Sequence, residues 1–421
     1  MTRVRISSEG PSLLEGYRAV VGDAPIRLLE AIAKRLRGRR IVMVNSTASG
    51  GGVAEILHRL VRLMTELGIP TTWEVMPGDA RFYAITKTIH NTLHGWPGEL
   101  TDDDHDYFME VNRRAAAELA LEGDLIMIHD PQPVGLADLR RRPGQHWIWR
   151  CHIDLSNANR DVWGFLAPRL PAYDASVFSH VAFVPALPIA GYLAPPSIDP
   201  LSDKNRELEE DEIDDLLRPF RLPRETPLVT QVSRFDRIKD PLGVIDAFLL
   251  TRRSEKAHLV LAGGSADDDP EGIAVLEEVR EKARGREDIS VLLLPAESHL
   301  VINALQRRST IVIQKSLREG FALTVSEALW KRRAVVAGAV GGIPLQIIHE
   351  RTGLLVRSIE GCAYQMTRLL TNPVLRRRLG REGRTHVREN FLHPREARDY
   401  LAMFARLVEA GRPTGAVQPA S

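Results

Sequence analysis

Residues Ile41-Val42-Met43-Val44-Asn45-Ser46-Thr47-Ala48-Ser49-Gly50-Gly51-Gly52 join a short β-branched run to a glycine-rich turn. Apolar side chains then recur at the spacing of one face of an α-helix. They are Val53, Ile56, Leu57, Leu60, Val61, Met64 and Leu67. A buried strand that leads through a tight turn into a helix is the opening unit of a parallel sheet. This stretch therefore predicts an α/β fold.

The same alternation continues along the chain. Strands are expected at residues 41–47, 125–129, 147–153, 176–184, 227–232, 258–262, 289–294, 310–314 and 334–337. Helical patterns lie between them, for example at residues 241–251, 272–283 and 323–332. Apolar strands separated by amphipathic helices indicate parallel sheets that are covered on both faces.

A seam divides the chain into two parts. Residues 195–200 are stiff and proline-rich, and an acidic run follows at residues 207–215, which we expect to be a solvated helix or linker. We predict two doubly wound parallel-sheet domains, residues 1–200 and 201–395, facing across a deep cleft. A last helical pattern at residues 396–410 could dock back on the first domain or stay with the second. Ligands of such sheets bind at the carboxyl ends of the strands.

Composition excludes several classes of protein. The chain has 421 residues, a net charge of +1 and two cysteines. This balance argues against a nucleic-acid or membrane-surface binder, and two cysteines are too few for a disulfide framework. The first residues lack the apolar core of a signal peptide, and the apolar stretch 181–196 contains four prolines. We therefore expect a cytoplasmic protein that binds neither membranes nor nucleic acid.

The first candidate site is the glycine loop. Gly50, Gly51 and Gly52 would let the backbone approach a phosphate or a sugar hydroxyl at a helix N-terminus. The dinucleotide pattern G-x-G-x-x-G fails because Glu55 occupies its third glycine position, and no Gly-Lys-Ser/Thr follows. The alternative is an ordinary strand-to-helix turn.

Two cations follow the expected strand 227–232. Arg234 and Lys239 precede a helix that opens at Pro241. An arginine fork and a lysine point charge can together neutralise a diphosphate. The alternative is a solvated loop whose cations pair with Asp236 or Asp240.

Two glutamates flank the start of a later helix. Glu319 lies in the loop and could accept hydrogen bonds from sugar hydroxyls, and Glu327 in the first turn could accept them from a ribose. The alternative for Glu327 is a capping box with Thr324, which has the required spacing. The turn at residues 341–344 either lines the same site or is merely a turn.

His152 is expected at the carboxyl end of the strand 147–153. A histidine near an aspartate can donate or accept hydrogen bonds in a binding site, although a structural histidine is the alternative. Cys151 is only a weak candidate nucleophile, because neighbouring residues of a strand point to opposite faces. Asp267-Asp268-Asp269 fits a solvated loop better than a metal site, and we predict no bound metal.

Taken together, these motifs resemble the retaining glycosyltransferases of family 4, which have the GT-B fold. The resemblance rests on Glu319 with Glu327 at the family's E-x7-E spacing, on the Arg234 and Lys239 pair, on the glycine loop, on His152, and on the turn at residues 341–344. A narrower resemblance is to the trehalose glycosyltransferring synthases. It rests on residues 44–55, 82–91, 149–154 and 195–201.

That narrower family transfers glucose from a nucleoside diphosphate glucose to free glucose, giving α,α-trehalose with retention. The resemblance implies roles for individual residues. Arg234 and Lys239 would hold the leaving diphosphate, Glu319 the donor glucose and Glu327 the ribose, while His152 would face the donor glucose. The remaining donor-binding positions implied are Gly320, Phe321, Ala322, Leu323, Gly51 and Gly52.

The acceptor site is assigned to Lys87, Asn91 and Asp154, with an ordinary amphipathic helix over residues 82–95 as the alternative. No cofactor is expected, although Mg²⁺ could accompany the diphosphate, and the family makes a homodimer plausible. Other readings stay open. They are a trehalose phosphorylase, a related glucosyltransferase with another small acceptor, a nicotinamide-dependent dehydrogenase, and a non-catalytic nucleotide-sugar sensor.

Overall fold

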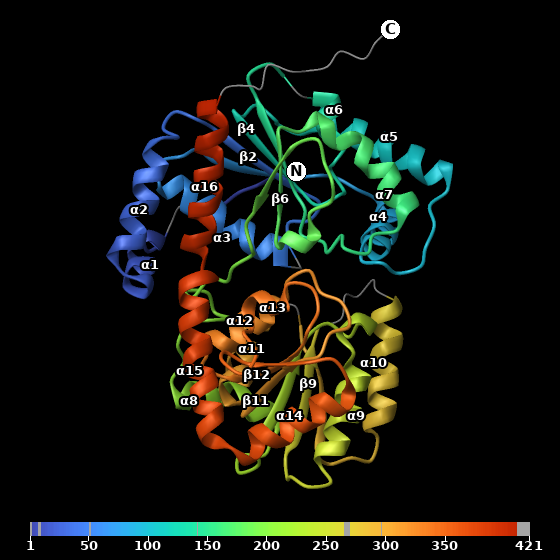
Figure 1. Cartoon of the computed structure of the whole chain (residues 1–421), viewed down its shortest axis with the longest axis vertical. Helices are drawn as coiled ribbons and strands as arrows, with labels where there is room; N and C mark the ends of the chain where they lie inside the picture. Colours follow the sequence, from blue (N-terminus) through green and yellow to red (C-terminus); the bar gives the residue numbers. More distant parts are fainter. Residues whose placement is uncertain are drawn as a thin grey trace. The chain divides into compact units, whose positions relative to one another are not determined.

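The computed structural model describes residues 2–6, 10–49, 52–140, 142–264, 270–295 and 297–410 (Figure 1). The chain forms two compact units. Unit 1 comprises the chain up to Pro195 together with the segment from His393 onward, and unit 2 is Pro196–Leu392. The chain therefore passes between the units twice, a few residues before each of the expected boundaries at 200 and 395.

Unit 1 contains a seven-stranded sheet in the order β1-β3-β2-β4-β5-β6-β7. All its pairs are parallel except that of β1 with β3. The strands are β1 (Arg3–Val4), β2 (Ile41–Asn45), β3 (Thr71–Val75), β4 (Leu125–His129), β5 (His146–Arg150), β6 (Ala175–Phe178) and β7 (Ala190–Leu193). The helices are α1 (Leu13–Val21), α2 (Asp23–Lys34), α3 (Gly52–Glu66), α4 (Ala80–Leu93), α5 (Asp102–Glu118), α6 (Leu136–Arg140), α7 (Arg160–Leu166) and α16 (His393–Ala410), with 3-10 turns η1 (Ala167–Ala172) and η2 (Val181–Phe183).

The core of unit 1 follows from the sequence pattern. Every residue of β2 and β4 is buried, as expected for central strands with helices on both faces. Helix α3 buries most of the stripe predicted from its spacing, whereas Val53 is half-buried and Leu67 lies beyond the end of the helix. Helix α4 begins where the Asp79 side chain accepts a hydrogen bond from the Phe82 amide. Helix α5 begins with a capping box between Thr101 and Asp104.

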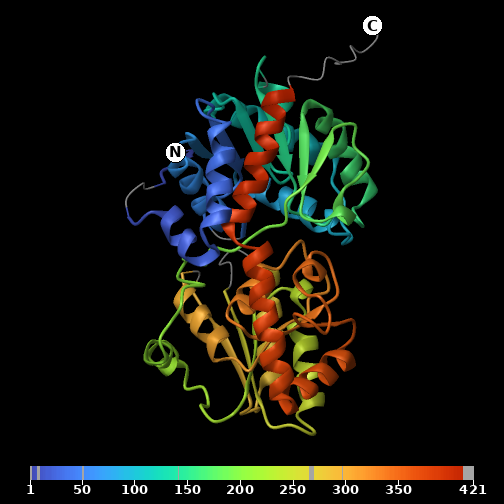
Figure 2. The same cartoon turned by 60° about the vertical axis from the view of Figure 1, so that its left-hand side comes forward.

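The last helix of the chain belongs to unit 1. Helix α16, red in Figure 2, runs beside α2 and α3. The Arg35 guanidinium holds the Glu409 carboxylate at 2.9 Å, and Arg150 Nε donates to the Tyr400 hydroxyl at 3.0 Å. Because Arg150 is fully buried, its Nε–H needs an acceptor within the protein, and the Tyr400 hydroxyl of α16 provides it.

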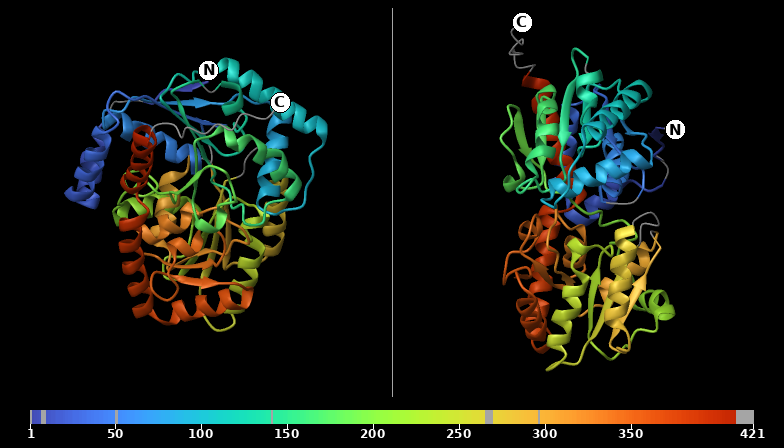
Figure 3. Two further views of the ribbon diagram at one scale, coloured as in Figure 1. Left: turned by 45° about the horizontal axis from the view of Figure 1, so that its top comes forward. Right: turned by 90° about the vertical axis from the view of Figure 1, so that its right-hand side faces the viewer.

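Unit 2 contains a six-stranded parallel sheet in the order β10-β9-β8-β11-β12-β13, with helices on both faces (Figure 3). The strands are β8 (Leu228–Val232), β9 (His258–Gly263), β10 (Ile289–Leu293), β11 (Ile311–Gln314), β12 (Ala334–Gly338) and β13 (Leu354–Val356). The helices are α8 (Glu210–Leu217), α9 (Pro241–Thr251), α10 (Pro270–Ala283), α11 (His299–Arg308), α12 (Leu323–Trp330), α13 (Ile343–Gln346), α14 (Ile359–Thr371) and α15 (Pro373–Asn390), with 3-10 turns η3 (Arg218–Phe220) and η4 (Arg237–Lys239).

Local sequence explains two helices of unit 2, α9 and α8. Pro241 opens α9, and the Asp240 side chain caps it by accepting from the Gly243 amide at 3.1 Å. The acidic run at residues 207–215 lies partly in α8, which is anchored by buried Ile213 and Leu217. It is therefore an amphipathic helix rather than a linker.

Several predicted elements need correction. The strand expected at 147–153 ends at Arg150, so His152 follows the strand instead of closing it. The run at 176–184 is strand only to Phe178, because the chain then turns into η2, which is capped by His180. Strand β3 was not predicted, since its five residues Thr71–Val75 mix polar and apolar types. The Asp267-Asp268-Asp269 run and the chain after Ala410 lie outside the described residues. Among those that are described, no helix is both long enough and apolar enough to cross a membrane.

Candidate functional site

The strand order of each sheet reverses at one point. In unit 2 the chain runs outward from β8 through β9 to β10, and on the other side from β11 through β12 to β13. Open α/β sheets bind ligands outside the carboxyl ends of the strands at such a reversal. The loops after β8 and β11 carry Arg234, Lys239 and Glu319, so unit 2 brings three of the predicted residues to its reversal point.

Lys239 and Glu319 form an ion pair. Lys239 Nζ lies 2.5 Å from Glu319 Oε1, and their side chains are 17% and 6% exposed. The lysine comes from η4, and the glutamate lies 80 positions further along the chain. A cation and a carboxylate thus stand side by side at the strand ends, where one can bind a phosphate oxygen and the other a hydroxyl.

The Glu319 carboxylate is held through one of its oxygens. Ser316 Oγ donates to Oε1 at 2.9 Å and Gln314 Nε2 donates at 3.3 Å, in addition to Lys239. No hydrogen bond within the described ranges involves Oε2, which leaves that oxygen available to a ligand. Sequence reasoning missed Gln314 and Ser316. The signal was the polar run Gln314-Lys315-Ser316 directly after an apolar strand.

A pair of glycines supports the backbone of Glu319. Gly341 has φ +53, and a Cβ there would lie 1.6 Å from the Glu319 carbonyl oxygen. A Cβ at Gly342 would lie 2.5 Å from the Gly320 carbonyl oxygen. The turn at residues 341–344 therefore packs directly beneath the glutamate loop, and only glycine fits there.

Residues 320–323 lead into α12. Ala322 has φ +70 and forms the N-cap, and no side chain caps the helix. The first amides of α12 thus lack a side-chain acceptor, a geometry that favours an anionic ligand group. Gln346 Nε2 donates to the Phe321 carbonyl oxygen and fixes this loop from below.

Glu327 is not a capping residue. Helix α12 starts at Leu323, which places Thr324 inside the helix and Glu327 in its second turn. The capping-box alternative is therefore wrong. Glu327 is 3% exposed, and Lys204 Nζ lies 3.8 Å from its carboxylate.

One turn after Glu327, Lys331 is buried, and no carboxylate of a described residue lies within hydrogen-bonding distance of it. Its Nζ donates to Gln306 Oε1 at 2.7 Å, Asn205 Oδ1 at 3.0 Å and the Glu327 carbonyl oxygen at 3.2 Å. Burial lowers the pKa of Lys331 to about 7. Sequence reasoning missed this lysine because it ends an ordinary helical pattern.

The remaining cations of this site are paired as well. Arg234 is largely exposed and lies 2.9 Å from the Asp236 carboxylate, which is the ion pair expected for a solvated loop. Lys315, which the sequence did not single out, contacts Asp240. Arg234 is therefore the more accessible cation of the pair, and Lys239 the more fixed.

In unit 1 the strand order reverses between β2 and β4. His129 ends β4, and His152 lies two residues beyond β5, the neighbouring strand. His129 Nδ1 and His152 Nε2 are 3.1 Å apart, and the two rings are stacked. Sequence reasoning missed His129 because it looked like the last residue of an apolar strand.

Burial keeps both imidazoles neutral. It lowers the pKa of His129 to about 3 and that of His152 well below 6.5, and the nearby Arg150 guanidinium lowers both further. Asp130 has φ +66, and its Oδ1 accepts from the His152 amide at 2.8 Å. The pKa of Asp130 is raised to about 6 by burial.

Cys151 is not a nucleophile. It is fully buried, and burial raises its pKa far above the usual value of a thiol. Cys362 is also buried, with a pKa raised to about 12, and both cysteines are free.

The acceptor candidates lie on two adjacent segments. Lys87 and Asn91 are one turn apart on α4, exposed and half-buried respectively. Asp154 is buried in the loop after β5, where its Oδ1 accepts from the Ser156 amide at 2.9 Å. The end of α4 touches that loop, because the Asn159 amide donates to the Thr92 carbonyl oxygen at 3.0 Å. Gly52 is the exposed first residue of α3, whereas Gly51 lies outside the described residues.

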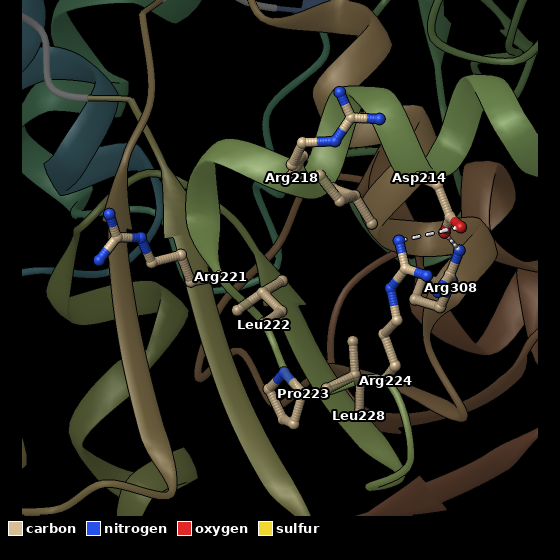
Figure 4. Close-up of a pocket in the computed structure, with 9 residues that line it drawn as sticks. Asp214, Arg218, Arg221, Leu222, Pro223, Arg224, Leu228 and Arg308 are labelled. Carbon is tan, nitrogen blue, oxygen red and sulfur yellow. Dashed lines mark hydrogen bonds and ion pairs between the residues drawn. The ribbon is translucent and has the colours of Figure 1, made fainter.

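A small pocket of about 140 Å³ lies elsewhere on unit 2 (Figure 4). It surrounds Leu228, the first residue of β8, and so lies at the opposite end of that strand from Lys239. Arg224 and Arg308 both form ion pairs with Asp214. The side chains of Arg218 and Arg221 point away from Asp214 (Figure 4). In the described part of the chain, no group of three or more His, Cys, Asp and Glu could hold a metal ion.

Comparison with known families covers both units. Residues 43–185 match the family described as "Trehalose synthase, N-terminal domain", and residues 212–386 match "Glycosyl transferases group 1". A trehalose synthase of Rubrobacter xylanophilus is 43% identical over 408 residues, covering 95% of this chain and 98% of that protein. One from Pyrococcus horikoshii is 39% identical over 410 residues, with the same coverage of 95% and 98%. A trehalose phosphorylase of Pleurotus pulmonarius is 30% identical over 461 residues, covering 96% of this chain and 62% of that protein.

Solved structures resemble the chain in fold. A sucrose-phosphate synthase from Thermosynechococcus elongatus aligns with a TM-score of 0.70 at 17% identity, covering 89% of this chain and 100% of that one. An α,α-trehalose-phosphate synthase from Burkholderia xenovorans, in complex with glucose-6-phosphate, aligns with a TM-score of 0.68 at 18% identity, covering 88% and 100%. At such low identity these likenesses bear on the fold alone, and they confirm the predicted GT-B fold.

Proposed function

This chain belongs to the trehalose synthase family of GT-B glycosyltransferases, and we propose that it transfers glucose from a nucleoside diphosphate glucose to free glucose. The product is α,α-trehalose, formed with retention at the donor's anomeric carbon. The observation that carries the proposal is the pairing of Lys239 with Glu319 at the reversal point of unit 2, where Glu319 keeps one carboxylate oxygen open.

Unit 2 binds the donor. Lys239 and Arg234 neutralise the diphosphate, and the backbone of Gly320, Phe321, Ala322 and Leu323 adds amides at the start of α12. Glu319 Oε2 accepts a hydrogen bond from a glucose hydroxyl, and Glu327 accepts from the ribose. When a diphosphate binds, one of its oxygens shares the Lys239 ammonium with the Glu319 carboxylate. Binding therefore draws Lys239 partly away from Glu319.

Unit 1 supplies the other groups. His152 hydrogen-bonds the donor glucose, and Gly51 and Gly52 allow close approach of the backbone to the donor. Lys87, Asn91 and Asp154 bind the acceptor. These assignments rest on the resemblance stated above and on the adjacency of α4 to the loop that carries Asp154.

The chemical step needs no protein nucleophile. The bond from the anomeric carbon to the phosphate oxygen breaks, and a bond to the acceptor oxygen forms on the same face. The acceptor's proton passes to the departing phosphate oxygen. The protein lowers the barrier by stabilising the charge that develops on the diphosphate, which is the task of Lys239 and Arg234.

A second candidate reaction is phosphorolysis of trehalose. It is favoured by the relationship to the Pleurotus phosphorylase, whose sequence this chain spans over about three fifths. Lys239 and Arg234 could hold inorganic phosphate where the first proposal has a diphosphate.

A substrate panel separates these reactions. The protein is incubated with ADP-, UDP- or GDP-glucose and with glucose, glucose 6-phosphate or fructose 6-phosphate, with and without Mg²⁺ and EDTA. Parallel reactions contain trehalose with phosphate, glucose 1-phosphate with glucose, and maltose alone. We expect trehalose only from a nucleotide glucose with glucose, with the α,α configuration read by proton NMR. Trehalose formed only from maltose, or only from glucose 1-phosphate with glucose, would refute the proposal.

Two further expectations stay predictions. The cytoplasmic location comes from the composition and the first residues of the chain, and the homodimer comes from the resemblance. Sedimentation of the purified protein tests the second of them, and cell fractionation tests the first.

A further inference from the structure

The stacked histidines of unit 1 raise a question about protons. His129 and Arg150 are register partners across β4 and β5, and His129 is 1% exposed. His129 Nδ1 contacts His152 Nε2 at 3.1 Å, while His129 Nε2 is buried and makes no hydrogen bond with any residue that the structure describes. His152 is only half-buried, and in the described part of the chain its Nδ1 has no hydrogen-bond partner.

When two neutral imidazoles form a hydrogen bond, one of the two contacting nitrogens must carry the proton and donate, and the other must accept. In the first arrangement, His152 Nε2–H donates to His129 Nδ1, and His129 then carries its own proton on Nε2. In the second, His129 Nδ1–H donates to His152 Nε2, and His152 then carries its proton on Nδ1. The neutral state of both rings follows from burial beside the Arg150 guanidinium.

The surroundings favour the second arrangement. The first would leave an N–H at His129 Nε2 buried without an acceptor, whereas the second leaves only a lone pair there. Orphaned buried N–H groups are the rarer of the two in folded proteins.

We propose that His129 is a positioning residue that holds His152 in the tautomer with its proton on Nδ1, so that His152 offers an N–H donor to an oxygen of the sugar donor. This inference rests on the proposed function, in which His152 faces the donor glucose. It also specifies what His152 does there, because a ring in the opposite tautomer would offer only an acceptor.

Nitrogen NMR tests the tautomer directly. Protein labelled with ¹⁵N-histidine is studied at about pH 7.5, and two-bond ¹H–¹⁵N spectra assign the protonated nitrogen of each ring. The signals of His129 and His152 are identified from their loss in His129→Gln and His152→Gln. We expect both rings to be neutral with the proton on Nδ1. A proton on His152 Nε2, or a charged His152 ring, would overturn the proposal. Because this readout needs no turnover, it stands or falls separately from the reaction proposed above.

Paired variants test the consequence. His129→Phe keeps a stacked ring but removes the donor, and His129→Asn places an amide nitrogen near the position of Nδ1. We expect kcat to fall about tenfold in His129→Phe, with little change in KM for the donor, and most of kcat to return in His129→Asn. The control His105→Phe lies in the same unit, where His105 stacks on Phe165, and should change kcat less than about twofold. Equal kcat in His129→Phe and the wild type, with the His152 tautomer unchanged, would also overturn the proposal. If His129→Phe fails to fold, the spectra of the wild type and of His129→Asn decide.

Discussion

The reversal points of the two sheets share a topology but differ in chemistry. In unit 2 the strand ends carry charges in pairs, Lys239 with Glu319 and Lys315 with Asp240. In unit 1 they carry two neutral imidazoles, and the pKa of each is lowered by burial. At its reversal point, one sheet thus carries ion pairs, and the other carries a pair of neutral imidazoles beside the buried Arg150 guanidinium.

The difference indicates a division of labour. A departing diphosphate needs cations that are already in place. A sugar, which is neutral, needs oriented hydrogen-bond donors and acceptors, and a charged histidine beside it would bind water more strongly than a hydroxyl does. If the comparison is correct, variants of unit 2 should affect nucleotide binding, and variants of the histidines in unit 1 should affect the chemical step.

Loss of the Glu319 charge is expected to have the largest effect. Glu319→Gln keeps the shape of the side chain but removes the carboxylate that Lys239, Ser316 and Gln314 hold. We expect trehalose formation to fall about 100-fold or more, with far-ultraviolet circular dichroism unchanged. The control is Glu278→Gln, which removes an exposed ion pair with Arg237. Similar activities of the two variants would remove Glu319 from the site.

A pair of glycine variants examines the scaffold under Glu319. Gly341→Ala would place a Cβ 1.6 Å from the Glu319 carbonyl oxygen, whereas Gly285 has φ +71 and nothing within 4 Å of its Cβ position. We expect Gly341→Ala to lower the free energy of unfolding by about 3 kcal/mol and to reduce activity. Gly285→Ala should cost about 1 kcal/mol and leave activity unchanged. Urea unfolding measures the change in free energy of unfolding for each variant. Equal changes would show that the loop carrying Glu319 moves freely to accommodate the added methyl group.

A third pair of variants separates the two units directly. Lys239→Ala should weaken binding of a nucleoside diphosphate about tenfold by calorimetry, because it removes a cation from the proposed diphosphate site. His152→Gln should leave that affinity within about twofold and lower kcat instead. Lys282→Ala, which breaks an ion pair with Asp246 in unit 2, controls for general charge. Nucleotide affinity reduced equally by Lys239→Ala and His152→Gln would break the comparison.

The smallest expected effect is a pH dependence of stability. Folded Lys331 loses its proton near pH 7, while in the unfolded chain it keeps the proton up to about 10.5. Between these values the unfolded state binds more protons, so stability should rise with pH, by at most about 1.4 kcal/mol per unit. Lys331→Met should remove this slope between about pH 7.5 and about pH 9. Parallel slopes for the variant and the wild type in urea unfolding would contradict the burial argument.

Some of these features could be predicted from sequence, and others could not. Apolar runs such as Leu125–His129 identify strands because a parallel sheet buries both faces. Arg234, Lys239 and Glu319 could be found because they follow such strands. Family membership makes this chain a glycosyltransferase, which replaces the dehydrogenase alternative.

What sequence reasoning missed depends on contacts between distant residues. The amino-acid sequence does not show that Gly341 packs on the Glu319 carbonyl oxygen, or that the Ser316 hydroxyl donates to the Glu319 carboxylate. His129 looked like the end of a strand, and only the pairing of β4 with β5 brings it to His152. The capping box at Thr324 failed because the helix begins two residues earlier than that motif needs.

The place of α16 has a consequence for how the protein is made. Unit 2 is one continuous segment, but unit 1 needs residues from both ends of the chain. On a translating ribosome, Arg150 emerges 250 residues ahead of Tyr400, which completes its hydrogen bonds. All residues of unit 2 are therefore synthesised before unit 1 is complete. Until α16 has been synthesised, β5 lacks its partner in that helix, and the nascent chain must avoid aggregation there.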